Sequence, residues 1–166
     1  MKIFKVFISV AILYVLIAQK LVYAQSTKPQ PDEKYKPLSS YSGDTSLYII
    51  ENFVTNQAFY KQKPLNVLLN RLEVPIKDFV YGSDTDDHEY TTHVSITAYQ
   101  NAEIERKVKL KKEPAILVIY WTKSVKILEV TQVVRKNQGV WNKDLADFFG
   151  EQVIDHIGYV KYPVNK

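Results

Sequence analysis

The alternation of apolar and polar residues between Thr91 and Tyr99 constrains the fold of this 166-residue chain more than any other feature. Val94, Ile96 and Ala98 are the apolar members, and hydroxyl-bearing or histidine side chains separate them. Successive side chains of a strand point to opposite faces, so the pattern predicts a strand with one buried face. The segment Ile104–Leu110 alternates in the same way. Together they predict an antiparallel hairpin turning at residues 101–103, with these side chains buried: Val94, Ile96, Val108 and Leu110.

Three further segments extend the predicted sheet. Ile76–Tyr81 is a candidate strand, Ala115–Trp121 is almost entirely apolar, and Val125–Val134 is rich in β-branched residues. Strands with apolar side chains on both faces are usually covered on both. We therefore expect the last two segments to form a second hairpin near the centre of the sheet.

Helical spacing of apolar residues appears in three places. Asp44 can cap a first helix, Pro64 suits the first turn of a second, and Asn142 can cap a third that runs to Ile157 and stops at Gly158. The fold class predicted from these elements is α+β. We expect a mainly antiparallel sheet of four to six strands with two or three helices packed against it.

The N-terminus has the three parts of a secretory signal. Lys2 and Lys5 precede an apolar run over residues 6–18, and Val22 and Ala24 occupy the positions that signal peptidase reads. The run is shorter than the roughly 20 apolar residues of a membrane span. Residues 1–24 are therefore predicted to be a signal peptide, and the protein to be exported to the periplasm or the extracellular space without a stable membrane anchor after cleavage.

The remaining chain is predicted to be a tether followed by one domain. Residues 25–43 contain Pro29, Pro31, Pro37 and several serines, which is typical of a disordered Pro/Ser-rich tether. Residues 44–166 are long enough for a single globular α+β domain.

Charge and cysteine content exclude several classes of function. Removal of the signal takes away Lys2, Lys5 and Lys20, so 22 basic against 18 acidic residues becomes 19 against 18. A nucleic-acid-binding domain usually has a marked basic excess, so we do not expect a nucleic-acid partner. The chain has no cysteine, which excludes disulfides, thiol chemistry and a lipid-modified cysteine.

No catalytic residue, cofactor or transition metal is predicted. The three histidines, His88, His93 and His156, lack the spacing of a zinc hydrolase, and the chain has neither a nucleophile elbow nor a glycine-rich phosphate loop. A weak calcium candidate consists of Asp84, Asp86, Asp87 and Glu89. It lacks the glycine and the later bidentate glutamate of an EF-hand loop, which favours a solvated turn.

The predicted hairpin implies one candidate binding face. Pairing Tyr99 with Glu105 would place a row of polar side chains beside a row of lysines on the outward side, namely His93, Ser95, Thr97, Lys107, Lys109 and Lys111. Such a face suits an anionic or polyhydroxyl ligand or an acidic loop of a protein partner. The alternative is an ordinary solvated face whose lysines protect a sheet edge.

These observations favour a non-catalytic binding or envelope-associated module. One alternative is a small secreted or periplasmic hydrolase whose carboxylates converge only in three dimensions, which a pocket with two or more buried titratable groups would favour. Another is an inhibitor or immunity-type protein. The ligand itself is not predicted beyond its chemical class.

Overall fold

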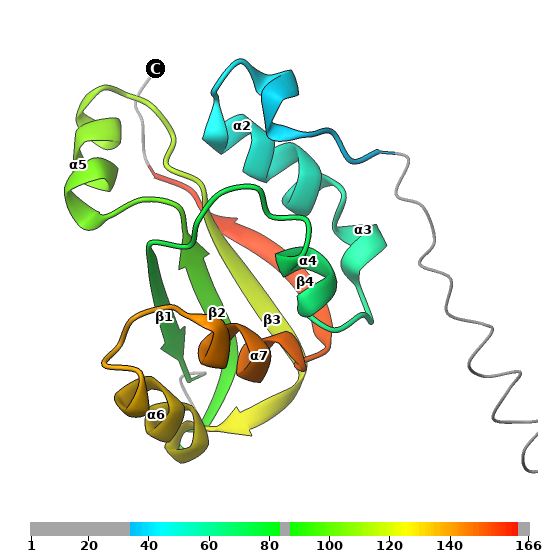
Figure 1. The fold of residues 1–166 in the computed structure, drawn as a ribbon, viewed down its shortest axis with the longest axis vertical. Helices are drawn as coiled ribbons and strands as arrows, with labels where there is room; N and C mark the ends of the chain where they lie inside the picture. The colour runs from blue at the N-terminus through cyan, green and yellow to red at the C-terminus, as the bar shows by residue number, and fades with distance from the viewer. Residues whose placement is uncertain (1–33, 84–86, 163–166) are drawn as a thin grey trace, which may run out of the picture. The chain divides into compact units, whose positions relative to one another are not determined.

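The computed structural model describes residues 34–83 and 87–162. One antiparallel sheet with the strand order β1-β2-β3-β4 forms the scaffold (Figure 1). Its strands are β1 (Asp78–Gly82), β2 (Tyr90–Thr97), β3 (Ile116–Lys126) and β4 (Ile154–Val160). The α-helices are α2 (Thr45–Ile49), α3 (Gln57–Tyr60), α4 (Asn66–Leu69), α5 (Asn101–Lys109), α6 (Ile127–Lys136) and α7 (Lys143–Gly150). A 3₁₀ turn, η1 (Leu38–Tyr41), precedes α2, and a π-helical segment, η2 (Ile50–Thr55), follows it.

The sheet buries one face against the helices. The buried strand residues occupy alternate positions, as Val94 and Ile96 do in β2 and Leu117 and Ile119 do in β3. They share one core with helix residues that include Tyr48, Phe53, Leu68, Leu145 and Phe149. Figure 1 shows α4 and α7 in front of the sheet on this side. The predicted α+β class with an antiparallel sheet is thus confirmed, with four strands and with more helices than the two or three expected.

Several predicted elements are present. The strand predicted over 91–99 is β2, and Ile76–Tyr81 corresponds to β1. The carboxylate of Asp44 accepts a hydrogen bond from the Leu47 amide at 3.0 Å and caps α2. Asn142 caps α7 in the same way, through a 3.2 Å bond from the Leu145 amide. The polar N-caps therefore start these helices where the sequence placed them.

The prediction of a hairpin between β2 and Ile104–Leu110 is wrong, because Ile104–Leu110 lies almost entirely in α5. The Glu103 carboxylate accepts the Gln100 amide at 2.9 Å, which is half of a capping box, and starts the helix. Ile104 is buried on one side of the helix, Val108 is half-buried, and Leu110 is 62% exposed. The strands that pair with β2 are β1 and β3.

The second predicted hairpin is also wrong. Strand β3 continues without a turn to Lys126, and the rest of Val125–Val134 belongs to α6. Val130 is buried there, and Val133 and Val134 are partly buried against the core. Packing of this apolar side outweighs the modest preference of β-branched residues for strands.

The predicted third helix ends earlier than expected. It stops at Gly150, and Ile154–Val160 forms β4 rather than a continuation of the helix to Ile157. A Cβ added at Gly150 would lie 3.3 Å from the Cβ of Asn66, so the missing side chain lets α7 and α4 pack closely. Ile154 and Ile157 are buried from the strand.

The folded domain begins earlier than the predicted tether allows. Tyr35 donates a hydrogen bond to the Arg71 carbonyl at 2.7 Å, the Lys36 amide donates to Asn52 Oδ1 at 2.9 Å, and Tyr41 is buried. These contacts place residues 34–43 in the domain, which corrects the expected tether over 25–43. The signal peptide predicted over 1–24 and the remainder of the tether lie outside the described residues.

No helix in residues 34–83 and 87–162 is long and apolar enough to cross a membrane.

Candidate functional site

The sheet face turned away from the core carries three successive rows of side chains. One row runs through Asp78, Thr97 and Ile116, and a second runs through Val80, Ser95 and Val118. A third contains Gly82, His93, Tyr120 and His156. Val80 is 63% exposed, so the face has no tight cover at the β1 edge. We call this surface the open face.

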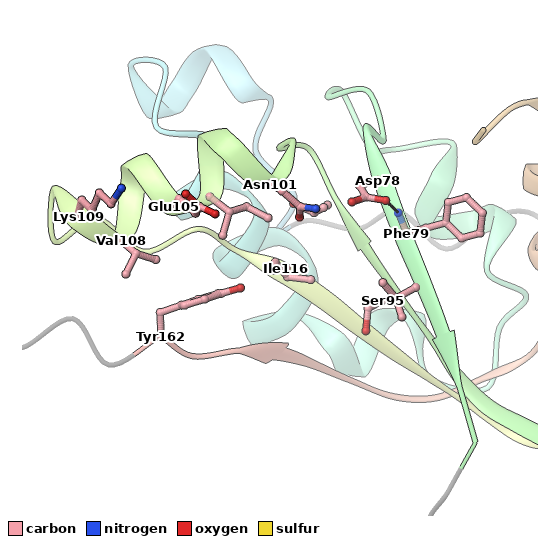
Figure 2. Close-up of a pocket in the computed structure, with 12 residues that line it drawn as sticks. Asp78, Phe79, Ser95, Asn101, Glu105, Val108, Lys109, Ile116 and Tyr162 are labelled. Atoms are coloured by element: carbon pink, nitrogen blue, oxygen red, sulfur yellow. Dashed lines mark hydrogen bonds between the residues drawn. The ribbon is translucent and has the colours of Figure 1, made fainter. Parts of the chain in front are cut away.

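A pocket of about 620 Å³ lies between α5 and the first two rows (Figure 2). Figure 2 shows α5 along one side, with Val108 pointing toward Tyr162 on the other. The apolar lining residues are Phe79, Val80, Ile104, Val108 and Ile116, and the polar ones are Asp78, Ser95, Thr97, Asn101, Glu105, Lys109 and Tyr162. We call this cavity the open-face pocket.

Two contacts fix its walls. Ile104 is buried and anchors α5 to the domain. The Tyr162 amide donates a hydrogen bond to Glu113 Oε1 at 3.1 Å, which holds the segment after β4 beside the loop that follows α5. The pocket therefore depends on α5 being a helix, because only then do Asn101, Glu105 and Val108 face the sheet from one side.

Most polar groups of the pocket have no partner within the described chain. Asp78 Oδ1 accepts the Phe79 amide at 2.8 Å, and Thr97 Oγ1 accepts the Tyr99 amide at 3.2 Å. Among residues 34–83 and 87–162, the following side chains make neither a hydrogen bond nor an ion pair: Ser95, Asn101, Glu105, Lys109 and Tyr162. Donors and acceptors thus converge on a partly apolar cavity, which is the composition of a small-molecule site.

Charge in the pocket disfavours an anionic ligand. Among the lining residues that the structure describes, Asp78 and Glu105 are carboxylates and Lys109 is the one cation. The formal charge of the lining is therefore negative, which repels a ligand of the same sign. The pocket suits a polyhydroxyl ligand better than an anion.

The structure separates the six residues predicted to bind a ligand. Ser95, Thr97 and Lys109 line the open-face pocket. His93 lies in the third row of the open face, Lys107 lines a different cavity on the other side of α5, and Lys111 is exposed beyond the helix with a φ of 56°. The cross-strand pairs expected between these lysines and β2 are absent, because α5 replaces the strand. Their role in binding stays a prediction.

Sequence reasoning missed the pocket residues Asp78, Asn101, Glu105 and Tyr162. Asn101 and Glu105 belong to α5, which was predicted as a turn and a strand. Tyr162 follows β4, where a longer helix was predicted. The available signal was Glu103 three residues after Gln100, which is the spacing of a capping box at the start of a helix.

The third row of the open face is a stack of rings. The centroids of His93 and Tyr120 are 5.3 Å apart, and His156 stacks almost parallel on Tyr120 at 4.1 Å. Gly82 makes room at the end of this row, since an added Cβ would lie 3.2 Å from the His93 ring. His156 Nδ1 lies 2.8 Å from Asp155 Oδ2, and this contact lowers the pKa of the Asp155 carboxyl. Tyr120 thus lies between the two histidine rings, and His156 at the end of the row is exposed.

The carboxylates of the open-face pocket bear on the hydrolase alternative. Asp78 is half-buried and Glu105 is exposed, so the two carboxylates of the pocket are not both buried. Buried carboxylates with shifted pKa values are the usual sign of acid-base catalysis. The open-face pocket therefore gives the hydrolase alternative no specific support.

The calcium candidate is only partly within the described chain. Asp84 and Asp86 lie outside it, and Asp87 and Glu89 are exposed. The Glu89 amide donates to Asp87 Oδ1 at 2.9 Å, as in a simple turn. Residues 34–83 and 87–162 contain no group of three or more histidine or acidic side chains arranged to hold a metal ion.

Comparisons of the chain with protein-family models, with curated proteins and with solved structures found no match.

Proposed function

We propose that this chain is an exported, non-catalytic binding module that holds a polyhydroxyl ligand, such as part of a glycan, in the open-face pocket. One observation carries the proposal: unpartnered polar side chains surround a partly apolar cavity of about 620 Å³. Bound ligands in such cavities gain affinity from apolar contact and specificity from a few polar groups.

The lining chemistry matches the two kinds of surface on a sugar ring. Hydroxyl groups can donate to the carboxylates of Asp78 and Glu105 and accept from the amide of Asn101. Carbon-bound hydrogens can pack on the ring of Tyr162 and on Val108. The negative formal charge favours neutral or amine-bearing ligands over acidic ones.

Export is the part of the proposal that rests on the sequence alone. The basic start, the apolar run of residues 6–18 and the small residues Val22 and Ala24 support it. An exported domain meets the glycans of the cell envelope and of the surroundings directly.

A glycan array probed with the full chain tests the proposal. We expect binding to neutral or amine-bearing glycans, and loss of that binding by about tenfold or more in the double variant Asn101→Ala/Glu105→Gln, because each lost hydrogen bond contributes about 0.5–1.5 kcal/mol. Both side chains are exposed, so the variant should fold normally.

Glu129→Gln is the matched control, because Glu129 is an exposed glutamate on α6, outside the pocket. Its glycan profile should equal that of the wild type. Wild-type binding that survives unchanged in the folded double variant would refute the assignment to this pocket.

A further inference from the structure

A second cavity, of about 520 Å³, lies between the start of α2 and the opposite side of α5. Its lining residues are Ser42, Gly43, Asp44, Ser46, Leu47, Ile50, Lys107, Lys112 and Glu113. The open-face pocket shares none of them. A ligand here is therefore independent of the function proposed above.

Lys107 is the unusual group in this cavity. It is half-buried, and its Nζ lies 3.5 Å from Ser46 Oγ and 4.5 Å from the ring centroid of Tyr99. Among residues 34–83 and 87–162 it has no carboxylate partner. Removing an ammonium group from water is costly unless an anion or several acceptors compensate it. The contact with the Tyr99 ring compensates only in part.

The hydroxyl of Ser46 holds this ammonium in place. Ser46 is 7% exposed and donates its proton to the Glu113 carbonyl at 2.5 Å. Its oxygen therefore accepts from Tyr99, 3.1 Å away, and from Lys107. The hydroxyl is fully engaged, whereas the ammonium has three N–H groups and keeps donors free for the cavity.

The two carboxylates of the cavity are already bonded to the backbone. Asp44 Oδ1 accepts the Leu47 amide at 3.0 Å, and Glu113 Oε1 accepts the Tyr162 amide at 3.1 Å. Lys112 is exposed, and its ammonium group has no hydrogen-bond or ion-pair partner within the described chain. The lining residues that the structure describes include two carboxylates and two lysines, so their formal charges cancel. Five of the seven residues in 106–112 are basic, and those outside the lining add positive charge nearby.

We propose that this cavity binds a phosphate group through the ammonium groups of Lys107 and Lys112. A phosphate carries close to two negative charges and several acceptor oxygens, so it can satisfy two ammonium groups that a single carboxylate charge would only half neutralise. Lysine binds phosphate as a point charge and needs no bidentate geometry.

Titration of the full, ¹⁵N-labelled chain with inorganic phosphate at low ionic strength tests the proposal by NMR. We expect saturable shifts of the amides that line the cavity, from Ser42 to Leu47 and at Lys112 and Glu113. The double variant Lys107→Met/Lys112→Met should lose affinity by about tenfold or more. Lys123→Met is the matched control, because Lys123 is exposed on β3 outside both pockets and its loss should leave the affinity unchanged.

Two outcomes would overturn the proposal: absence of saturable shifts in the wild type, or equal affinities in the double variant and in Lys123→Met. If Lys107→Met prevents folding, the single variant Lys112→Met decides in the same way, because that side chain is exposed and its removal leaves the fold intact.

Vesicles distinguish the sources of the phosphate group. Cosedimentation of the full chain with vesicles that contain phosphatidic acid, whose headgroup is a phosphomonoester, but not with pure phosphatidylcholine vesicles, and its loss in the double variant would identify a lipid headgroup. Saturable binding of inorganic phosphate without cosedimentation would identify a soluble phosphate compound.

Discussion

The phenol of Tyr35 connects the first described residues to the rest of the domain. Its hydroxyl lies 3.1 Å from that of Tyr48 and 2.7 Å from Glu73 Oε1. Burial raises the pKa of both phenols, and the bond to Glu73 raises that of Tyr35 further. Both groups are therefore kept neutral in the folded protein.

This cluster predicts a loss of stability in alkali. The folded protein holds the phenolic protons more tightly than the unfolded chain, in which tyrosine has a pKa of about 10. The two phenols therefore contribute their full stabilisation below about pH 10, and this contribution to the free energy of unfolding falls as the pH rises further. Urea unfolding of the wild type and of Tyr35→Phe/Tyr48→Phe between pH 8 and 11 measures it. The variant should show a smaller decrease above pH 10, and parallel decreases would contradict this account.

Stability measurements can distinguish helix α5 from the strand that was expected for the same residues. Ile104 is buried and Leu110 is 62% exposed, whereas a strand would point both side chains to one face. Ile104→Ala should lower the free energy of unfolding by about 2–4 kcal/mol, and Leu110→Ala should change it by less than about 0.5 kcal/mol. Equal losses measured by urea unfolding would contradict the helix.

The cap of α7 allows a second test at this scale. Asn142 Oδ1 accepts the Leu145 amide at 3.2 Å, so Asn142→Ala should cost about 1 kcal/mol in thermal or urea unfolding. Asn142→Asp keeps the acceptor and serves as the control. A loss of the same size in both variants would show that the cap is not the cause.

The sequence predicted correctly those elements whose apolar spacing fits either a strand or a helix, but not both. Strand β2 alternates between half-buried and buried side chains from His93 to Ile96, and Asp44 and Asn142 each cap the helix that the sequence predicts after them. Ile104 and Val108 are four residues apart, a spacing that both an alternating strand and a helix satisfy. The capping contact of Glu103 with Gln100 decided that segment in favour of the helix.

The prediction of the candidate site depended on whether Ile104–Leu110 was taken as a strand or as a helix. Ser95 and Thr97 line the open-face pocket because they alternate in β2 with the buried Val94 and Ile96, although Thr97 itself is 7% exposed. Lys109 reaches the same pocket from a helix. The remaining lining residues could not be predicted, since they meet only after α5 folds beside the open face. Tyr162 joins them because β4 follows Gly150 where a longer helix was expected.

At the scale of the whole molecule, the proposed export predicts the mass of the mature protein. Cleavage after Ala24 would leave a chain that starts at Gln25. Intact-mass spectrometry of the protein recovered outside the cytoplasm measures this directly. A retained Met1 in that fraction would contradict the predicted signal peptide.

The sheet divides the domain into a core side and an open side. Helices cover one face, while α5 closes only one end of the other and leaves a pocket there (Figures 1 and 2). The central claim is that this pocket is a binding site for a polyhydroxyl ligand. If the claim is right, a bound ligand shifts the amide resonances of residues on the open side and leaves those on the core side unchanged.

Amide chemical-shift mapping of the full chain with a set of neutral and amine-bearing oligosaccharides tests that claim most directly. The account predicts saturable shifts for at least one oligosaccharide, concentrated at Asp78–Val80, Ser95–Thr97, Asn101–Lys109 and Tyr162, with the amides of α6 unchanged. A native spectrum in which no oligosaccharide of the set shifts these amides at millimolar concentration would contradict it.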